Sequence, residues 1–453
     1  MKNFFQTLKN IWRIDDLRNR IIATLGLILV YRVGAHIVLP GIDPNQLSNL
    51  SNQAKDGIMS ILNMFSGGAF ANASIFALGI MPYITASIIV QLLGMAVPYF
   101  QRLQRDGESG RRKINRIIRI LTVGVMLVQA PSYLINLGYQ LPNSAFLIDP
   151  LDKEAFFWGF SFPSVIILTA GTLFIMWLGE RITDKGIGNG ISLLIMIGII
   201  ARFPFALYAE FASRVTEVGG GGFIALIVEI VMLFLVFVVS ILLVQGTRRI
   251  PVQYAKRIIG NKQYGGVRQY IPLKVNAAGV MPIIFAQALM FIPLMFTHFN
   301  TETTSSIASA FSDYTGFWYN FTFALLVIVF TYFYTAITFS PQQMADDMKK
   351  RGGYIPGVKP GKKTMEFLDV IMSRITLPGS IFLAFIAILP VFAILCGINN
   401  QFAQFYGGTS LLIMVGVILD TLQQIESHLL MRHYDGLMKS GRIKGRTGSV
   451  AAL

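Results

Sequence analysis

The stretch that decides the fold is GIMPYI at residues 79–84, because it returns as GVMPII at residues 279–284. Both copies lie inside apolar segments long enough to cross a lipid bilayer. Each copy combines a glycine, which permits close helix approach or a hinge, with a proline, which bends a helix. Matched bends at two places in the chain predict either ordinary kinked packing or a movable seam between two related halves.

Working outward from these copies, we predict an all-α membrane protein. The chain has 54% hydrophobic residues and 13% charged residues, whereas an average soluble domain has roughly a quarter charged residues. Apolar runs predict ten spans, at residues 21–39, 72–97, 118–138, 157–178, 188–208, 222–245, 276–296, 317–339, 376–396 and 409–430. The two copies fall in the second and seventh spans, so the second half is expected to be inverted. Inverted repeats place a transport path at the interface between the halves.

Basic residues are confined almost entirely to one side of the predicted membrane. The loops and termini on that side hold 33 of the 38 Lys and Arg residues, and the exceptions are Arg32, Lys55, Lys153, Arg202 and Arg214. By the positive-inside rule, both termini are then cytoplasmic. The net charge of +15 is also compatible with nucleic-acid binding, but membrane orientation explains most of it.

The charge and hydropathy patterns divide the chain into parts. Residues 1–20 predict an amphipathic cytoplasmic helix on the membrane surface, with no cleavable signal before the first span. The first five-helix half is expected at 21–208, the second at 222–430, and a cytoplasmic tail at 431–453. Residues 56–71 are apolar but too broken to cross, which is typical of either a re-entrant segment or an external amphipathic loop.

Two predicted cytoplasmic loops, at residues 245–275 and 340–375, are longer than orientation requires. Their basic clusters include Arg248, Arg249, Lys256, Arg257, Lys349, Lys350, Arg351 and Lys359. One interpretation is solvated charge that only orients the protein. The other, which the loop length favours, is a docking surface for a large cytosolic partner, including one that exposes phosphates.

The groups that an enzyme or an ion-coupled carrier would need are scarce. Ionisable residues inside the predicted spans include Arg32, His36, Glu229, Asp420 and Glu426. The four histidines and the single cysteine, Cys396, show no metal-ligand spacing. GIGNG at residues 186–190 lacks the Lys-Ser/Thr ending of a phosphate loop and predicts a tight turn. We therefore expect no enzymatic activity, no metal, no cofactor, and an uncharged lining suited to a hydrophobic constriction.

The sequence around the first copy, SIFALGIMPYITASIIVQL at residues 74–92, resembles a signature of the SecY family of protein-conducting channels. MWLGERITDKGIGNGIS at 176–192 resembles a second signature of this family. Shorter matches follow in order: PLKVN at 272–276, PGVKPG at 356–361 and GGTS at 407–410. The resemblance covers essentially the whole chain. It implies an hourglass pore between two inverted five-helix halves. It also implies a lateral gate with spans 2 and 3 on one side and spans 7 and 8 on the other.

Matched residue by residue, the resemblance also implies functional roles. It assigns a pore ring to Ile80, Ile84, Ile191, Ile195, Ile284 and Ile413, and a polar gate cluster to Thr85, Ser87, Gln129 and Asn276. It assigns a plug to residues 58–70, including Asn63, Met64, Phe65, Ser66, Gly67 and Gly68. Taken singly, such residues are more often ordinary packing or helix–helix hydrogen bonds. Lys359 stands where family members often carry arginine, and lysine lacks the bidentate fork.

The function implied is a passive conduit in the bacterial plasma membrane. Unfolded secretory polypeptides would cross through the ring, and hydrophobic segments would leave into lipid through the gate. The partners implied are SecE and SecG, the SecA motor ATPase, the ribosome, signal sequences and translocating polypeptides, anionic lipids, and accessory SecD, SecF and YidC. Energy is expected from a partner. The alternative from the residues alone is a secondary solute transporter with inverted repeats.

Overall fold

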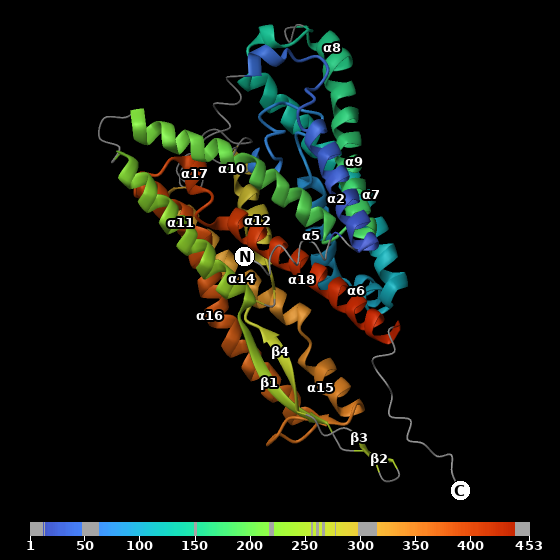
Figure 1. Ribbon diagram of the computed structural model, residues 1–453. Coiled ribbons are helices and arrows are strands. Elements are labelled where there is room, and N and C mark those ends of the chain that lie inside the picture. Colours follow the sequence, from blue (N-terminus) through green and yellow to red (C-terminus); the bar gives the residue numbers. More distant parts are fainter. Residues whose placement is uncertain are drawn as a thin grey trace.

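The computed structural model describes residues 12, 14–47, 63–148, 152–216, 222–254, 257–259, 262–264, 268–276, 278–297 and 315–439. These residues are mostly helical. In Figure 1 the helices of residues 15–185, blue to green, gather on one side of the molecule, and those of residues 222–395 gather on the other. Helices α10 (Gly190–Thr216) and α18 (Gly408–Lys439) contact each other between the two groups.

Besides the shared helices α10 and α18, the first group contains five α-helices and one short helical turn, α8. They are α2 (Asp15–Gly34), α5 (Met81–Ala96), α6 (Pro98–Arg105), α7 (Gly107–Gln140), α8 (Lys153–Phe156) and α9 (Phe162–Lys185). Short 3₁₀ turns lie at Pro44–Leu47 and Asn143–Ala145, and a π-helical turn at Phe157–Ser161 joins α8 to α9.

The second group contains the remaining helices and all the strands. The helices are α11 (Gly222–Gln245), α12 (Met281–Thr297), α14 (Phe317–Thr338), α15 (Pro341–Lys350), α16 (Lys362–Leu395) and α17 (Asn400–Ala403). The strands are β1 (Thr247–Tyr254), β2 (Arg257–Ile259), β3 (Lys262–Tyr264), β4 (Arg268–Lys274) and β5 (Gly353–Tyr354).

Within the described residues, seven helical segments are long and apolar enough to cross a membrane. They are 107–140, 154–185, 190–215, 222–245, 317–350, 362–395 and 408–429. Helices α5 and α6 meet at a bend of 102° and make an eighth if they count as one span. Helices α2 and α12 occupy the first and seventh predicted spans. The chain is thus a multi-pass helical membrane protein, as the hydropathy predicts.

The second predicted span differs from expectation at its beginning. The sequence predicts a span from residue 72, but the chain runs through successive turns from Ser66 and becomes helical only at Met81. The turns contain Gly67 and Gly68 at positive φ, a conformation that L side chains rarely adopt. Hydropathy does not detect this difference, because an irregular buried segment is as apolar as a helix.

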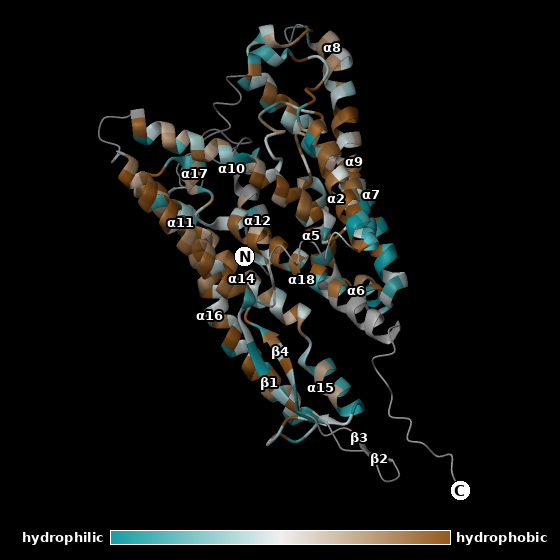
Figure 2. Ribbon diagram, viewed as in Figure 1, coloured by the Kyte–Doolittle hydropathy of each residue, from teal (hydrophilic) through white to brown (hydrophobic). Residues whose placement is uncertain are grey.

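Strands β4, β1 and β5 form one antiparallel sheet, in that order, and β2 pairs with β3. The sheet joins the two long loops, because β1 and β4 come from the first loop and β5 from the second. Ile250, Val252 and Leu273 pack from the sheet against Met348 of α15 and Leu368 of α16. We call β1 to β5 with α15 the basic lobe. Figure 2 shows teal, hydrophilic residues on this lobe and brown, apolar residues along α11 and α16.

Each helix group has its own apolar core, and a third core connects them. One core contains Met126, Leu137 and Leu168 of the first group. Another contains Ile283, Val327 and Leu383 of the second group. The largest, which we call the central cluster, draws buried residues from both groups and from α10 and α18. The two helix groups are therefore joined by a shared core.

Candidate functional site

The two copies of the repeated motif adopt similar backbone conformations. Gly79 and Gly279 have φ of +55° and +66°, and the helices begin two residues later, at Met81 and Met281. The proline of each copy lies in the first turn of its helix, where its missing N–H leaves no hydrogen bond unmade. The sequence alone indicated that each proline kinks a continuous helix. In the structure the prolines instead lie at the beginning of α5 and α12.

The structure brings the six predicted ring isoleucines into the central cluster. Four are almost fully buried, with exposed fractions of 4% for Ile80, 8% for Ile84, 4% for Ile195 and 3% for Ile413. Ile191 and Ile284 are half-buried and pack against the same cluster. The six come from the beginning of α5 and from α10, α12 and α18. No single helix presents this set.

Sequence reasoning missed one member of this group. Val280 packs against the central cluster immediately before α12, at the position that corresponds to Ile80 in the repeat. Aligning the two copies of the motif would have found it, because Ile80 and Ile84 then correspond to Val280 and Ile284.

The described part of the predicted plug, residues 63–70, lies against the same cluster; residues 58–62 are outside the described residues. Met64, Phe65 and Ala69 are buried in the central cluster. The Ser410 hydroxyl, in the first turn of α18, lies 2.9 Å from the sulfur of Met64. The segment is also folded on itself, since the Ser66 hydroxyl accepts a hydrogen bond of 3.0 Å from the Phe70 N–H.

Three side chains that sequence reasoning did not assign hold this segment from the first helix group. They donate hydrogen bonds to its backbone carbonyl oxygens: Tyr31 to Ser66 (3.3 Å), Arg32 to Gly67 (2.9 Å) and Tyr133 to Phe70 (3.1 Å). Arg32 was notable in the sequence only as a charge inside a span. Its partner is a backbone oxygen, which leaves no signal in the sequence.

Gly67 touches the backbone of α10 directly. A Cβ built on Gly67 would lie 2.8 Å from the Cα of Gly198, closer than real Cβ contacts occur. A Cβ on Gly198 would lie 3.2 Å from the Cα and N of Gly67. Because neither residue has a side chain, the 63–70 segment can lie flat on α10 beside the ring.

The predicted gate cluster is spread over three elements: Thr85 and Ser87 on α5, Gln129 on α7 and Asn276 before α12. Among the described residues, no hydrogen bond joins any two of these four side chains. Asn276 is 7% exposed, and its Oδ1 has no hydrogen-bond partner in the described part of the chain. Gln287 of α12, 6% exposed, has an unpartnered Oε1 in the same way. A buried carbonyl oxygen without a donor destabilises the arrangement that buries it.

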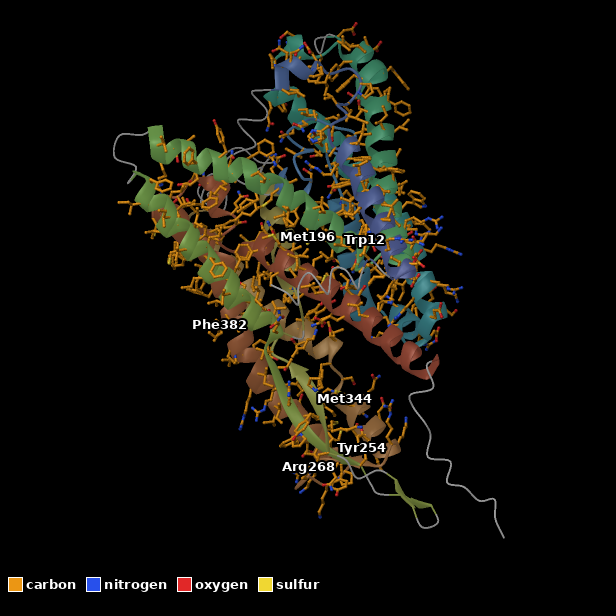
Figure 3. All side chains as sticks on the ribbon, in the orientation of Figure 1. Trp12, Met196, Tyr254, Arg268, Met344 and Phe382 are labelled. Carbon is orange, nitrogen blue, oxygen red and sulfur yellow. The ribbon has the colours of Figure 1, made fainter. Side chains whose placement is uncertain are left out.

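The basic lobe carries most of the predicted docking residues on its surface. Arg248 and Arg249 of β1, Lys349 and Lys350 of α15, Arg351 and Lys359 are all exposed. Arg257 lies on β2, and Lys256 is outside the described residues. Within the described part of the chain, no acidic side chain pairs with the exposed six. Figure 3 labels Tyr254, Arg268 and Met344 in this lobe, well away from Met196 of the central cluster.

Comparison with known proteins identifies what this arrangement resembles. The SecY family profile matches residues 74–422. A protein translocase subunit SecY from Streptomyces coelicolor is 43% identical over 441 residues, which cover 94% of this chain and 98% of that protein. A solved structure from work on how the SecY plug domain stabilises the closed state of the translocation channel superposes with a TM-score of 0.59 at 19% identity. It covers 90% of this chain and 92% of that chain.

A canine Sec61 channel, solved in a ribosome-channel complex from the endoplasmic reticulum, superposes with a TM-score of 0.55 at 19% identity. It covers 90% of this chain and 92% of that chain. At these identities the structural matches establish a shared fold.

Proposed function

Because this chain belongs to the SecY family, we propose that its described residues form the pore, seal and docking surface of a protein-conducting channel. Membership of the SecY family establishes the following general properties of the chain. The chain is a multi-pass channel subunit of the plasma membrane, its family translocates proteins, and the family is not enzymatic. The finer assignments below are proposals about particular residues.

The six isoleucines form the constriction, and residues 63–70 form part of a plug that rests on it when the channel is idle. One observation supports this above the others: four separate elements supply the isoleucines to a single cluster that also contains Met64 and Phe65. Such a ring binds no particular side chain strongly, because dispersion contacts are weak individually and non-directional. It can therefore seal around a passing chain of changing composition.

The architecture we propose is ten membrane spans in two inverted five-helix halves, with both termini in the cytoplasm. The two copies of the repeated motif, each beginning a helix beside the central cluster, support the inverted repeat. Helices α5 and α7 pack together, and so do α12 and α14. The lateral gate lies between these two pairs of helices. Asn276 and Gln287 weaken the closed gate, because closure buries their oxygens without donors.

The basic lobe is the docking surface for cytosolic partners. Its exposed cations, which have no acidic partner among the described residues, favour a phosphate-rich or acidic surface, and the ribosome in the canine Sec61 complex is such a surface. We propose the ribosome and the SecA motor as alternative occupants. SecE and SecG as small membrane subunits, signal sequences, anionic lipids and the accessory SecD, SecF and YidC follow from family resemblance alone.

Reconstituted vesicles test the channel and its seal together. The chain with SecE, SecG, SecA and ATP is expected to make a secretory precursor resistant to external protease. Ile413→Asn should raise ion leak and admit precursors with defective signal sequences. The matched control is Ile418→Asn on the same helix, where the side chain is 41% exposed and should tolerate the change. Saturable uptake of a small solute without precursor entry would instead favour the transporter.

A further inference from the structure

A buried group of charged residues joins the two halves where the central cluster reaches Tyr406. Arg214, near the end of α10, forms ion pairs with Glu210 of the same helix (2.9 Å) and with Glu229 of α11 (2.6 Å). Its guanidinium also donates to the Gly397 carbonyl (2.7 Å), and Glu210 Oε2 accepts from the Asn399 N–H (2.8 Å). The group therefore links α10 to α11 and to the connection between α16 and α17.

The two carboxyl groups in this junction are both buried, Glu210 completely and Glu229 almost completely. The side chain of Glu210 is 0% exposed and that of Glu229 is 9% exposed. Both oxygens of Glu210 accept hydrogen bonds, one from Arg214 and one from Asn399. Glu229 Oε1 accepts from Arg214, but Glu229 Oε2 is buried and has no donor in the described part of the chain.

Among the described residues, the charges around these carboxyls are few. Arg214 and Glu210 are the charged groups that α10 contributes to the junction, and α11 has no ionisable residue besides Glu229. The connection at 396–407 contributes Tyr406, whose hydroxyl donates 2.6 Å to the backbone oxygen of Glu229, and Cys396, which is exposed. Burial, with Glu229 and Glu210 nearby, raises the pKa of Tyr406 well above its usual range, so Tyr406 stays a neutral donor.

Two buried carboxylates that share one guanidinium carry one negative charge in excess. Like charges held together in a low-dielectric site disfavour full ionisation, and one carboxyl of such a pair keeps its proton. A proton on Glu229 Oε2 would remove the excess charge and make the unpartnered oxygen a donor to the Glu210 side chain, which lies within hydrogen-bonding reach of Glu229. Oε2 is the atom at which a proton relieves both costs.

We propose that Glu229 and Glu210 form a proton-binding site at the junction of the two halves. The proton comes from water, binds Glu229 Oε2 and returns to water when the site ionises. In the protonated state the junction is neutral and holds α10 to α11 firmly, whereas proton loss leaves two carboxylates on one arginine and loosens it. In the proposed orientation the site lies at the external end of the membrane, so the pH outside sets its occupancy.

Infrared difference spectroscopy of the full-length chain in lipid nanodiscs tests the proposal directly. A protonated carboxyl absorbs at a carbonyl frequency separate from that of carboxylates. Wild-type protein should show this band at neutral pH and lose it at alkaline pH. The conservative variant Glu229→Gln should lack the band, and Glu210→Gln should also lose it because Glu229 then ionises beside Arg214. The matched control Glu154→Gln changes an exposed carboxyl on α8 and should keep the band.

Two results would overturn the site. One is a wild-type spectrum with no protonated carboxyl at neutral pH, and the other is a band that Glu229→Gln leaves unchanged. If Glu229→Gln does not fold, Glu210→Gln decides, since persistence of the band in that variant contradicts the shared proton. None of these measurements depends on protein translocation, so they fail or succeed independently of the proposed channel function.

Discussion

Replacing Gly67 with alanine should displace the plug from its closed position. Gly67 has φ of +65°, and the Cβ of an alanine there would lie 2.8 Å from the Cα of Gly198 on α10. Carbon atoms in contact sit about 3.5–4.0 Å apart, so the segment must move by about 1 Å or lose its backbone conformation. Helix α10 does not yield easily at Gly198, because this residue lies inside the helix and on the N-terminal side of Pro204, the proline that interrupts its hydrogen bonds.

The free-energy change can be estimated from two contributions. Left-handed backbone costs about 1–2 kcal/mol for a residue with a side chain. A shift of about 1 Å also breaks the 2.9 Å bond from Arg32 to the Gly67 carbonyl, and a bond to a charged group contributes about 1.5–3 kcal/mol. The sum is at least about 2.5 kcal/mol, which raises the ratio of displaced to seated plug about 70-fold or more.

Single-channel recordings of the reconstituted chain in planar bilayers measure this ratio, because they give the fraction of time that the channel spends conducting. Gly198→Ala separates the two contributions, because Gly198 has no positive φ and its Cβ would meet Gly67 at 3.2 Å. It should give a smaller increase. Gly124→Ala on α7, where a Cβ meets nothing within 4 Å, should give none.

The fraction of time spent conducting should therefore be highest in Gly67→Ala, intermediate in Gly198→Ala and lowest in Gly124→Ala. Equal conductance in all three variants would refute the claim that backbone contact between the 63–70 segment and α10 maintains the seal. An increase in Gly124→Ala alone would refute it equally.

Three further changes test other parts of the structure. Tyr133→Phe removes the donor to the Phe70 carbonyl and should raise conductance about fivefold, the effect of one net hydrogen bond of about 1 kcal/mol. Asn276→Leu removes a buried unpartnered oxygen, so it should raise the unfolding temperature and slow signal-dependent gate opening, as site-specific crosslinking would report. Reversing Arg248 and Arg249 to glutamate should weaken ribosome binding in sedimentation assays at low salt, and the difference should shrink as salt screens the charges.

Much of the architecture was predictable because membrane insertion imposes simple rules on the sequence. Apolar length locates most of the spans that the structure describes. The orientation given by the basic residues and the two halves indicated by the repeated GxMPxI motif stay predictions. The family and its channel function were also predictable, since the motifs around the second and fifth spans are specific and the comparisons confirm them. Both kinds of information are local in the chain.

What hydropathy could not predict is where apolar chain stops being helical. The turns before Met81 and the sheet that joins the two basic loops depend on backbone pairing and on glycines at positive φ. The alternation of apolar Ile250 and Val252 with polar residues and proline in β1 was a usable sequence signal, but the surrounding charges obscured it.

The sequence by itself determined that this protein lies in a membrane and which family it belongs to. Tertiary structure alone decided which side chains meet. Arg32 reaches the Gly67 carbonyl, Gly67 lies on Gly198, and Arg214 bridges Glu210 to Glu229. Apart from the pair of Arg214 with Glu210 on one helix, these contacts join residues separated in the chain, often through backbone atoms that every residue shares, so only folding in three dimensions could specify them.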